Sequence, residues 1–210
     1  MSVPFHIDLN GKVAVVTGAG GVLCSGMAEA LAQCGAKVAL LDLNGDAAKQ
    51  SADKITAAGG IAKGYQANAL EKDSLETAHM KILDDFGPCD ILINGAGGNH
   101  PLATTDKEYF SAADLDEDVK TFFDLGQSGV EFVFNLNFIG TLLPTQVFAR
   151  DMVGRKGCNI LNISSMNAYA PLTKIPAYSG AKAAVSNFTQ WLAVHFASEG
   201  IRVNALAPGF

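Results

Sequence analysis

The chain has 210 residues, of which 49% are hydrophobic and 17% charged, a composition typical of a globular protein. This length predicts one domain over residues 1–210, because most domains contain about 100–200 residues. The formal net charge of −6 argues against a nucleic-acid partner, which requires a basic face. No run of about 18 uninterrupted apolar residues suggests a membrane span, and the N-terminus lacks the basic and apolar segments of a secretion signal.

The cysteine pattern indicates a reducing, cytosolic environment. Cys24, Cys34, Cys89 and Cys158 show no CxxC spacing and stand in apolar stretches. Such a pattern is typical of buried free thiols, with a metal site as the alternative interpretation. Composition and cysteines together predict a cytosolic α/β protein.

Short apolar runs alternate with helical patterns along the chain. The expected strands are residues 13–17, 37–42, 61–67, 90–94, 158–164 and 201–206. The expected helices are residues 22–33, 45–58, 71–86, 131–153 and 176–198. This alternation, with right-handed crossovers, predicts a doubly wound parallel sheet (a Rossmann fold) with helices on both faces. Ligands bind such sheets at the carboxyl ends of the strands, which directs attention to the loops after the first, fourth and fifth strands.

Some segments depart from this regular alternation. Residues 95–129 are polar, glycine-rich and acidic, and predict a long loop excursion with one or two short helices near the active site. The acidic run within it, Asp114 to Asp118, is typical of a solvated face. Gly140 and Pro144 are expected to bend the helix over 131–153. The chain stops at Phe210 soon after a strand, so we expect the natural protein to continue and the last strand of the fold to be missing here.

A glycine-rich turn, Thr17-Gly18-Ala19-Gly20-Gly21-Val22-Leu23-Cys24, follows the first expected strand. Glycines let the backbone approach a pyrophosphate, whose charge the next helix N-terminus favours. A plain strand–helix turn is the alternative.

Asp42 ends the second expected strand, at the spacing of an acid that accepts both hydroxyls of an adenosine ribose. Such a carboxylate would repel a 2′-phosphate, and neither Leu43 nor Asn44 supplies a cation, so NAD is preferred over NADP. Taken alone, Asp42 is equally consistent with a helix-capping or turn acid.

Tyr178 and Lys182 stand four residues apart in Tyr178-Ser179-Gly180-Ala181-Lys182, so they share one face of the expected helix. A nearby ammonium favours the phenolate form that an acid/base catalyst uses. Ser165 comes just after the fifth strand, where its hydroxyl can hold a substrate carbonyl. The tyrosine–lysine pair alone is also consistent with a surface tyrosine beside a solvated lysine, but the three residues together favour a catalytic set.

The motifs, in this order, resemble those of short-chain dehydrogenase/reductases, and the resemblance runs from about Lys12 to the end of the chain. The motifs that carry it are Thr17-Gly18 with its glycine turn, Asn94-Gly95-Ala96-Gly97, Asn137, Ser165, Tyr178, Lys182 and Pro208-Gly209. The resemblance implies an NAD(P)-dependent oxidoreductase that acts on CH–OH groups of a small molecule, with the hydride carried by the cofactor. It also implies a homo-oligomer, either a dimer or a tetramer.

The resemblance implies roles for individual residues. Tyr178 would exchange a proton with the substrate oxygen, and Lys182 would bind the nicotinamide ribose and promote ionisation of the tyrosine. Ser165 would orient the carbonyl, and Asn137 would hold a water that passes protons to solvent. The implied cofactor-binding residues are Thr17, Gly18, Gly20, Gly21, Val22, Leu23, Asp42, Leu43, Asn68, Ala69, Asn94, Gly95, Ala96, Gly97, Tyr178, Lys182, Pro208 and Gly209.

The chain departs from the family's usual residues at several of these positions. Val22 and Cys24 stand where the turn usually has glycine, and both side chains are expected to crowd the pyrophosphate. Asn94-Gly95 stands where two asparagines are frequent. Asn68 stands in place of an acid, and its amide can still bind adenine.

Within the family, several stretches are most similar to D-mannonate (fructuronate) oxidoreductases. They are residues 97–101, 133–146 and 163–182. This similarity implies a sugar-acid substrate, with Asn99, His100, Ser165, Asn167 and Lys174 as polar groups of its site, where a steroid or acyl pocket would need apolar lining. The alternatives are that these residues only face solvent, that the substrate is another polyol, gluconate or a 3-ketoacyl thioester, or that the chain is a non-catalytic nucleotide-binding protein of the same fold.

Overall fold

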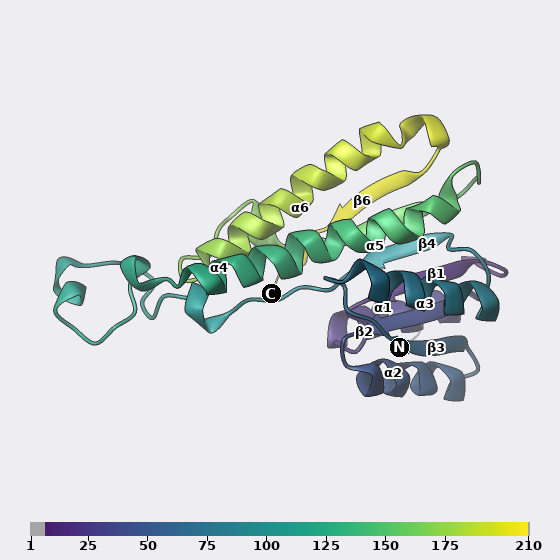
Figure 1. Ribbon diagram of the computed structural model, residues 1–210, viewed down its shortest axis with the longest axis horizontal. Coiled ribbons are helices and arrows are strands. Elements are labelled where there is room, and N and C mark those ends of the chain that lie inside the picture. The colour runs from purple at the N-terminus through teal and green to yellow at the C-terminus, as the bar shows by residue number, and fades with distance from the viewer. Residues whose placement is uncertain (1–6, 210) are drawn as a thin grey trace.

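A computed structural model describes residues 7–209 of the protein, so residue 210, at which the chain stops, lies outside the described part. Its strands are β1 (Val13–Thr17), β2 (Lys37–Asp42), β3 (Ile61–Gln66), β4 (Ile91–Asn94), β5 (Asn159–Ile163) and β6 (Arg202–Leu206). They form one parallel sheet in the order β3-β2-β1-β4-β5-β6 (Figure 1). The predicted doubly wound sheet is confirmed, and its strand order reverses between β1 and β4, where such sheets bind ligands.

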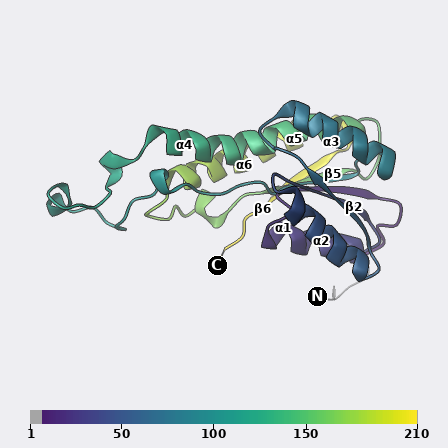
Figure 2. The same ribbon diagram turned by 60° about the horizontal axis from the view of Figure 1, so that its bottom comes forward.

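Helices cover both faces of the sheet (Figure 2). They are α1 (Val22–Gln33), α2 (Gly45–Ala57), α3 (Lys72–Asp85), α4 (Gln127–Phe134), α5 (Gly140–Phe148) and α6 (Pro176–His195). In β1, Ala14 and Val16 pack in the core on one face, with residues of α1 and α2, whereas Val13 and Val15 pack in the core on the other, with residues of α3, α5 and α6. Burial on both faces explains why this strand is apolar at every position except its last.

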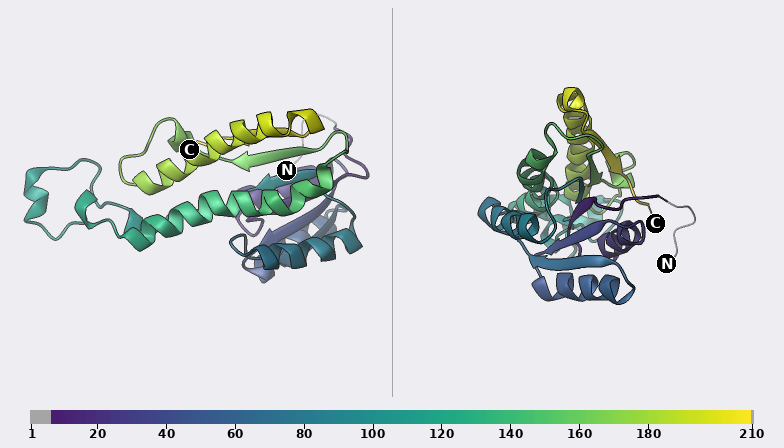
Figure 3. Two further views of the ribbon diagram at one scale, coloured as in Figure 1. Left: turned by 45° about the horizontal axis from the view of Figure 1, so that its top comes forward. Right: turned by 90° about the vertical axis from the view of Figure 1, so that its right-hand side faces the viewer.

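Residues 104–126, between β4 and α4, form an arm that extends away from the sheet (Figures 1 and 3). The three short helices η1 (Pro101–Ala103), η2 (Ala112–Leu115) and η3 (Phe122–Asp124) lie at its base and within it. The arm lies within the predicted excursion over 95–129, and α4 already begins at Gln127. The acidic run is exposed at Asp116, Glu117 and Asp118, as expected. Asp114 is the exception, because it is only 4% exposed and accepts hydrogen bonds from Lys107 and from the backbone amide of Ser111.

The single bent helix expected over 131–153 is divided in the structure. α4 is followed by a π-helical turn, η4 (Asn135–Ile139), and α5 continues into η5 (Ala149–Met152). Pro144 lies inside α5, and the irregular turn ends just before Gly140. The run Gln127–Met152 is long and apolar enough to cross a membrane by length and composition. Much of that apolar character belongs to residues of its second half that are buried in the core, such as Phe148.

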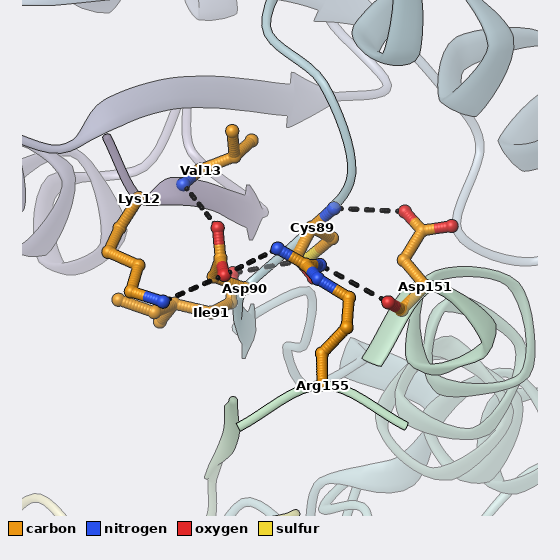
Figure 4. A network of polar contacts seen from close by, with 7 residues as sticks. All are labelled: Lys12, Val13, Cys89, Asp90, Ile91, Asp151 and Arg155. Carbon is orange, nitrogen blue, oxygen red and sulfur yellow. Dashed lines mark hydrogen bonds and ion pairs between the residues drawn. The ribbon is translucent and has the colours of Figure 1, made fainter. Parts of the chain in front are cut away.

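A polar cluster joins the amino ends of β1 and β4 (Figure 4). Asp90, which is 2% exposed, accepts hydrogen bonds from Val13 N at 2.9 Å, from Lys12 Nζ at 3.1 Å and from the Arg155 guanidinium at 2.7 Å. Arg155 also donates to the carbonyl of Cys89 at 3.0 Å. This cluster lies at the edge of the sheet opposite the carboxyl ends of the strands.

All four cysteines are free thiols. Cys24, Cys89 and Cys158 are buried, as expected. Cys34 is only partly buried, because it is the C-cap residue of α1 and lies at the helix end.

Candidate active site

A cavity of about 710 Å³ lies at the carboxyl ends of β1, β2 and β4 and extends to α6. This volume is within the range of small-molecule sites. The predicted cofactor-binding residues that line it are Thr17, Gly18, Gly21, Val22, Leu23, Asp42, Leu43, Asn68, Ala69, Gly95, Ala96, Gly97, Tyr178 and Lys182. The fold therefore brings residues from four separate loops and α6 to one cavity.

Further apolar residues that the sequence motifs did not indicate also line the cavity. They include Leu41, Leu70, Leu75, Phe132, Leu136 and Ile163. Phe132 and Leu136 lie one turn apart across α4 and η4, and their spacing in the sequence is the one pattern that indicates a shared apolar face. It could not be assigned to the cavity because the expected helix had no known direction relative to the sheet.

The glycine turn holds the loops after β1 and β4 against each other. Gly18 has a φ of +66°, which favours glycine, and a Cβ there would lie 2.8 Å from the carbonyl oxygen of Gly95. Thr17 Oγ1 accepts hydrogen bonds from Gly95 N at 3.0 Å and Ala96 N at 3.3 Å. Among the described residues, no side chain caps the first turn of α1, so its amides remain available to an anion.

Asp42 is oriented by two backbone amides. Its Oδ2 accepts a hydrogen bond from Gly20 N and its Oδ1 from Asn44 N, both at 2.9 Å. Each carboxylate oxygen keeps a further lone pair for a ligand hydroxyl. Gly20 does not line the cavity but positions this acid, since a Cβ on Gly20 would lie 3.0 Å from Asp42 Oδ2.

Lys182 and Tyr178 lie on one face of α6, as their spacing predicts. Lys182 is 4% exposed, its Nζ donates to the carbonyl of Ile163 at 2.7 Å, and it lies 5.6 Å from the centroid of the Tyr178 ring. Burial lowers the pKa of Lys182 to about 8. At neutral pH the ammonium is still mostly charged, and it lies beside the phenol.

Asn137, in the π-helical turn η4, binds the loop after β4 through hydrogen bonds. Its Nδ2 donates to the carbonyls of Gly98 and Val133, both at 2.7 Å, and its Oδ1 accepts from Gly98 N at 3.3 Å. A Cβ on Gly97 would lie 2.7 Å from Asn137 Oδ1 and 3.1 Å from Lys182 Nζ. The structure thus brings Asn137 and Lys182 together at this glycine, while the proton-passing role of Asn137 stays a prediction.

Ser165 caps the short helix η6 (Met166–Ala168), with its Oγ accepting from Asn167 N at 3.2 Å. Met166 N donates to the carbonyl of Pro208 at 3.0 Å, so Pro208-Gly209 lies beside the serine loop and outside the cavity lining. Asn167 is buried, and its Oδ1 has no hydrogen-bond partner among residues 7–209.

Several predicted site residues lie elsewhere. Asn94, a predicted cofactor-binding residue, is 1% exposed and outside the cavity lining, and its Nδ2 donates to Thr145 Oγ1 and Asn162 Oδ1. Asn99, His100 and Lys174 do not line the cavity.

The two departures in the glycine turn differ in their surroundings. Val22 is 93% exposed at the cavity rim, whereas Cys24 is 4% exposed. The sulfur of Cys24 fills the space that a Cβ on Gly95 would occupy. Both side chains were expected to crowd a pyrophosphate. The Cys24 side chain is instead packed beneath the loop after β4, whereas Val22 is exposed.

Known proteins resemble this chain over nearly all of its length. An uncharacterized oxidoreductase of Haemophilus influenzae is 61% identical over 100% of this chain and 73% of its own. The uncharacterized oxidoreductase UxuB of Bacillus subtilis is 50% identical over 99% of this chain and 74% of its own. A crystal structure from Haemophilus influenza with bound NAD, provisionally described as a D-mannonate oxidoreductase, is 62% identical with a TM-score of 0.95, over 97% of this chain and 72% of that one. The family model for short chain dehydrogenases matches residues 12–210. The chain belongs to the short chain dehydrogenase family.

Proposed function

We propose that the protein is an NAD-dependent oxidoreductase that interconverts a ketone and a secondary alcohol on a sugar acid of the D-mannonate/D-fructuronate type. The observation that carries this proposal is the Lys182 ammonium, buried at the cavity wall 5.6 Å from the Tyr178 ring. Among residues 7–209 no carboxylate pairs with it. A buried, unpaired lysine in a ligand cavity is typical of a functional group.

The cavity residues fit a dinucleotide. Asp42 can accept the hydroxyls of one ribose, the free amides at the start of α1 can bind the pyrophosphate, and Lys182 with Tyr178 can bind the second ribose. When bound there, the cofactor supplies or accepts the hydride. The Asp42 carboxylate would repel a 2′-phosphate, which supports NAD over NADP, as does the NAD in the similar structure.

Side chains of the protein would transfer the proton to and from the substrate oxygen. We assign Tyr178 as the acid or base that exchanges a proton with the substrate oxygen, with the Lys182 ammonium 5.6 Å from the centroid of its ring. Ser165 would orient the carbonyl by a hydrogen bond. Asn137 would serve the proton path from its position beside Gly97 and Lys182.

A hydroxylated acid is the substrate class that the polar residues of the loops after β4 and β5 favour. Asn99, His100 and Asn167 stand in these loops, outside the cavity lining, and Asn99 Nδ2 donates to Thr104 Oγ1. The Lys174 ammonium also lies outside the lining and makes no ion pair within the described part of the chain. The name of the similar NAD-bound structure points to the same class.

Replacement of Tyr178 by Phe tests the catalytic assignment. We expect kcat to fall by about 10²–10⁴-fold, because the proton donor is lost, while NADH still binds, as measured by fluorescence titration. Tyr109→Phe is the matched control, since Tyr109 is 78% exposed on the arm, and its kcat should equal that of the wild type. A Tyr178→Phe enzyme with wild-type turnover would contradict the proposal, and a wild type that binds NADH but turns over no carbonyl would indicate a non-catalytic protein.

A substrate panel tests the sugar acid. We expect NADH oxidation with fructuronate to be far faster than NADH oxidation with acetoacetyl thioesters or NAD reduction with simple polyols. Equal or reversed rates would remove the sugar-acid assignment and leave the reaction class. In the same assay NADH should be preferred over NADPH, and the opposite preference would contradict the role given to Asp42.

We also propose that the protein is a cytosolic homo-oligomer, a dimer or a tetramer. The free thiols support a reducing compartment, and family membership supports the oligomer. Light scattering on the purified protein would give the subunit number, and a monomer at assay concentrations would contradict this part of the proposal.

A further inference from the structure

The loop after β4 rests on the side chain of Cys24, in the first turn of α1. A Cβ added to Gly95 would overlap the sulfur of Cys24, while it would lie 2.9 Å from the carbonyl oxygen of Thr17 and 3.6 Å from the Cβ of Cys24. The sulfur is therefore the atom that most strictly forbids a side chain at position 95. Cys24 is 4% exposed, so the thiol has little room to move aside.

Gly95 is also held in place from the β1 side. Its amide donates to Thr17 Oγ1 at 3.0 Å, and its carbonyl oxygen lies so close to Gly18 that a Cβ there would be 2.8 Å away. The loop therefore cannot rise from the sulfur without disturbing the hydrogen bond to Thr17.

The position of this loop sets the shape of the cavity. Gly95, Ala96 and Gly97 line it opposite the first turn of α1, and Gly97 lies against Lys182. A displacement at Gly95 would move the wall against which the dinucleotide would lie, and with it the contact of Gly97 with the catalytic lysine.

We propose that Cys24 and Gly95 are a matched pair that fixes the spacing between α1 and the loop after β4, which makes Cys24 a positioning residue for the dinucleotide. The proposal rests on the proposed NAD site. The two positions are complementary in the structure: the Cys24 side chain fills the space left by glycine at 95.

A double-mutant cycle in NADH affinity tests the pair. The wild type, Cys24→Ala, Gly95→Ala and Cys24→Ala/Gly95→Ala are titrated with NADH by fluorescence. We expect Gly95→Ala to raise the Kd at least about tenfold, because the loop must lift off the sulfur. In the double variant the sulfur is absent and the remaining Cβ of residue 24 is in ordinary contact, so its Kd should be at least about threefold lower than that of Gly95→Ala. Recovery should be incomplete because the Thr17 carbonyl stays close.

If the fold-changes in Kd caused by Cys24→Ala and Gly95→Ala multiply in the double variant, the two substitutions act independently and the proposal is overturned. Coupling confined to the free energy of unfolding would also overturn it, since the pair would then serve packing alone. If Gly95→Ala does not fold, the NADH affinities of Cys24→Val and Cys24→Ala test the pair instead. The larger valine should press on Gly95 and weaken NADH binding more than alanine does. The reverse order would contradict the pair.

Two controls match these variants. Gly26→Ala, also in α1, adds a methyl group where no atom outside its chain neighbours and the surrounding helix backbone lies within 4 Å, and it should leave the Kd unchanged. Cys34→Ala/Gly95→Ala removes the thiol at the other end of α1 and should bind no better than Gly95→Ala; rescue there would overturn the proposal. A wild type that binds no NADH contradicts the proposed cofactor, whereas NADH binding with independent effects at positions 24 and 95 contradicts only the pair.

Discussion

Burial of Lys182 makes the stability of the protein depend on pH in a specific direction. Its pKa in the folded protein is about 8, below the ordinary lysine value of about 10.4, because burial penalises the charged form. Between these two values the unfolded chain binds a proton that the folded chain has released. The free energy of unfolding therefore increases as pH rises through this window. At neutral pH it is lower, because the folded protein buries a charged ammonium.

Comparison with Lys182→Met isolates this effect. We expect the unfolding free energy of the wild type, relative to that of Lys182→Met, to increase by about 2 kcal/mol between pH 7.5 and pH 10. Urea titrations of both proteins at several pH values measure this difference, and other titrating groups cancel in the subtraction. A difference that stays constant with pH, or decreases, would show that the lysine is not desolvated.

At the scale of elements, a ladder of buried amides and hydroxyls joins α5 to α6, the helix that carries Tyr178 and Lys182. Thr145 of α5 bonds to Asn94 of β4, which bonds to Asn162 of β5, whose Nδ2 donates to Thr189 of α6 at 2.9 Å. Asn94 and Asn162 are register partners on adjacent strands. The ladder thus fixes α5 and α6 to the same two strands.

Asn162→Leu should break this ladder without changing the size of the side chain greatly. We expect a loss of about 2–3 kcal/mol in unfolding free energy, because Asn94 and Thr189 would each lose a buried partner. Asn204→Leu is the control, since Asn204 is exposed on β6 and should change stability by less than about 0.5 kcal/mol. Equal effects of the two substitutions in chemical denaturation would contradict a stabilising ladder.

Elements with a regular pattern could be predicted from the sequence, and those set by contacts between distant residues could not. The apolar run of β1 and the spacing of Tyr178 and Lys182 carry their own periodicity, so both were predicted correctly. Asn94 was a predicted cofactor-binding residue through the family resemblance of its motif, but its side chain bonds to Asn162, 68 residues away, a contact that no local pattern indicates. The π-helical turn at Asn135–Ile139 has no local pattern, and the packing of Cys24 against Gly95 joins two loops that only the fold brings together.

At the scale of the whole molecule, the cavity and the polar cluster around Asp90 lie at opposite ends of the strands. The cavity lies at the carboxyl ends of the strands, whereas the cluster around Asp90 ties β1, β4 and the segment after α5 at the opposite edge (Figure 4). Lys12 and Arg155 are about one-third exposed, so solvent weakens their attraction to Asp90, while Asp90 itself is buried. A substitution there should act on folding and not on the cavity.

Asp90→Asn tests this separation. We expect the unfolding free energy to fall by about 2 kcal/mol, because the amide is neutral and leaves both cations without a buried carboxylate. The Kd for NADH of the folded variant should stay within about twofold of the wild type, since the altered residue lies at the far edge of the sheet. Asp53→Asn is the control: it removes the exposed Lys49–Asp53 pair of α2 and should leave the urea midpoint unchanged within error. An Asp90→Asn protein with wild-type stability but weakened NADH binding would show that the two edges of the sheet are coupled.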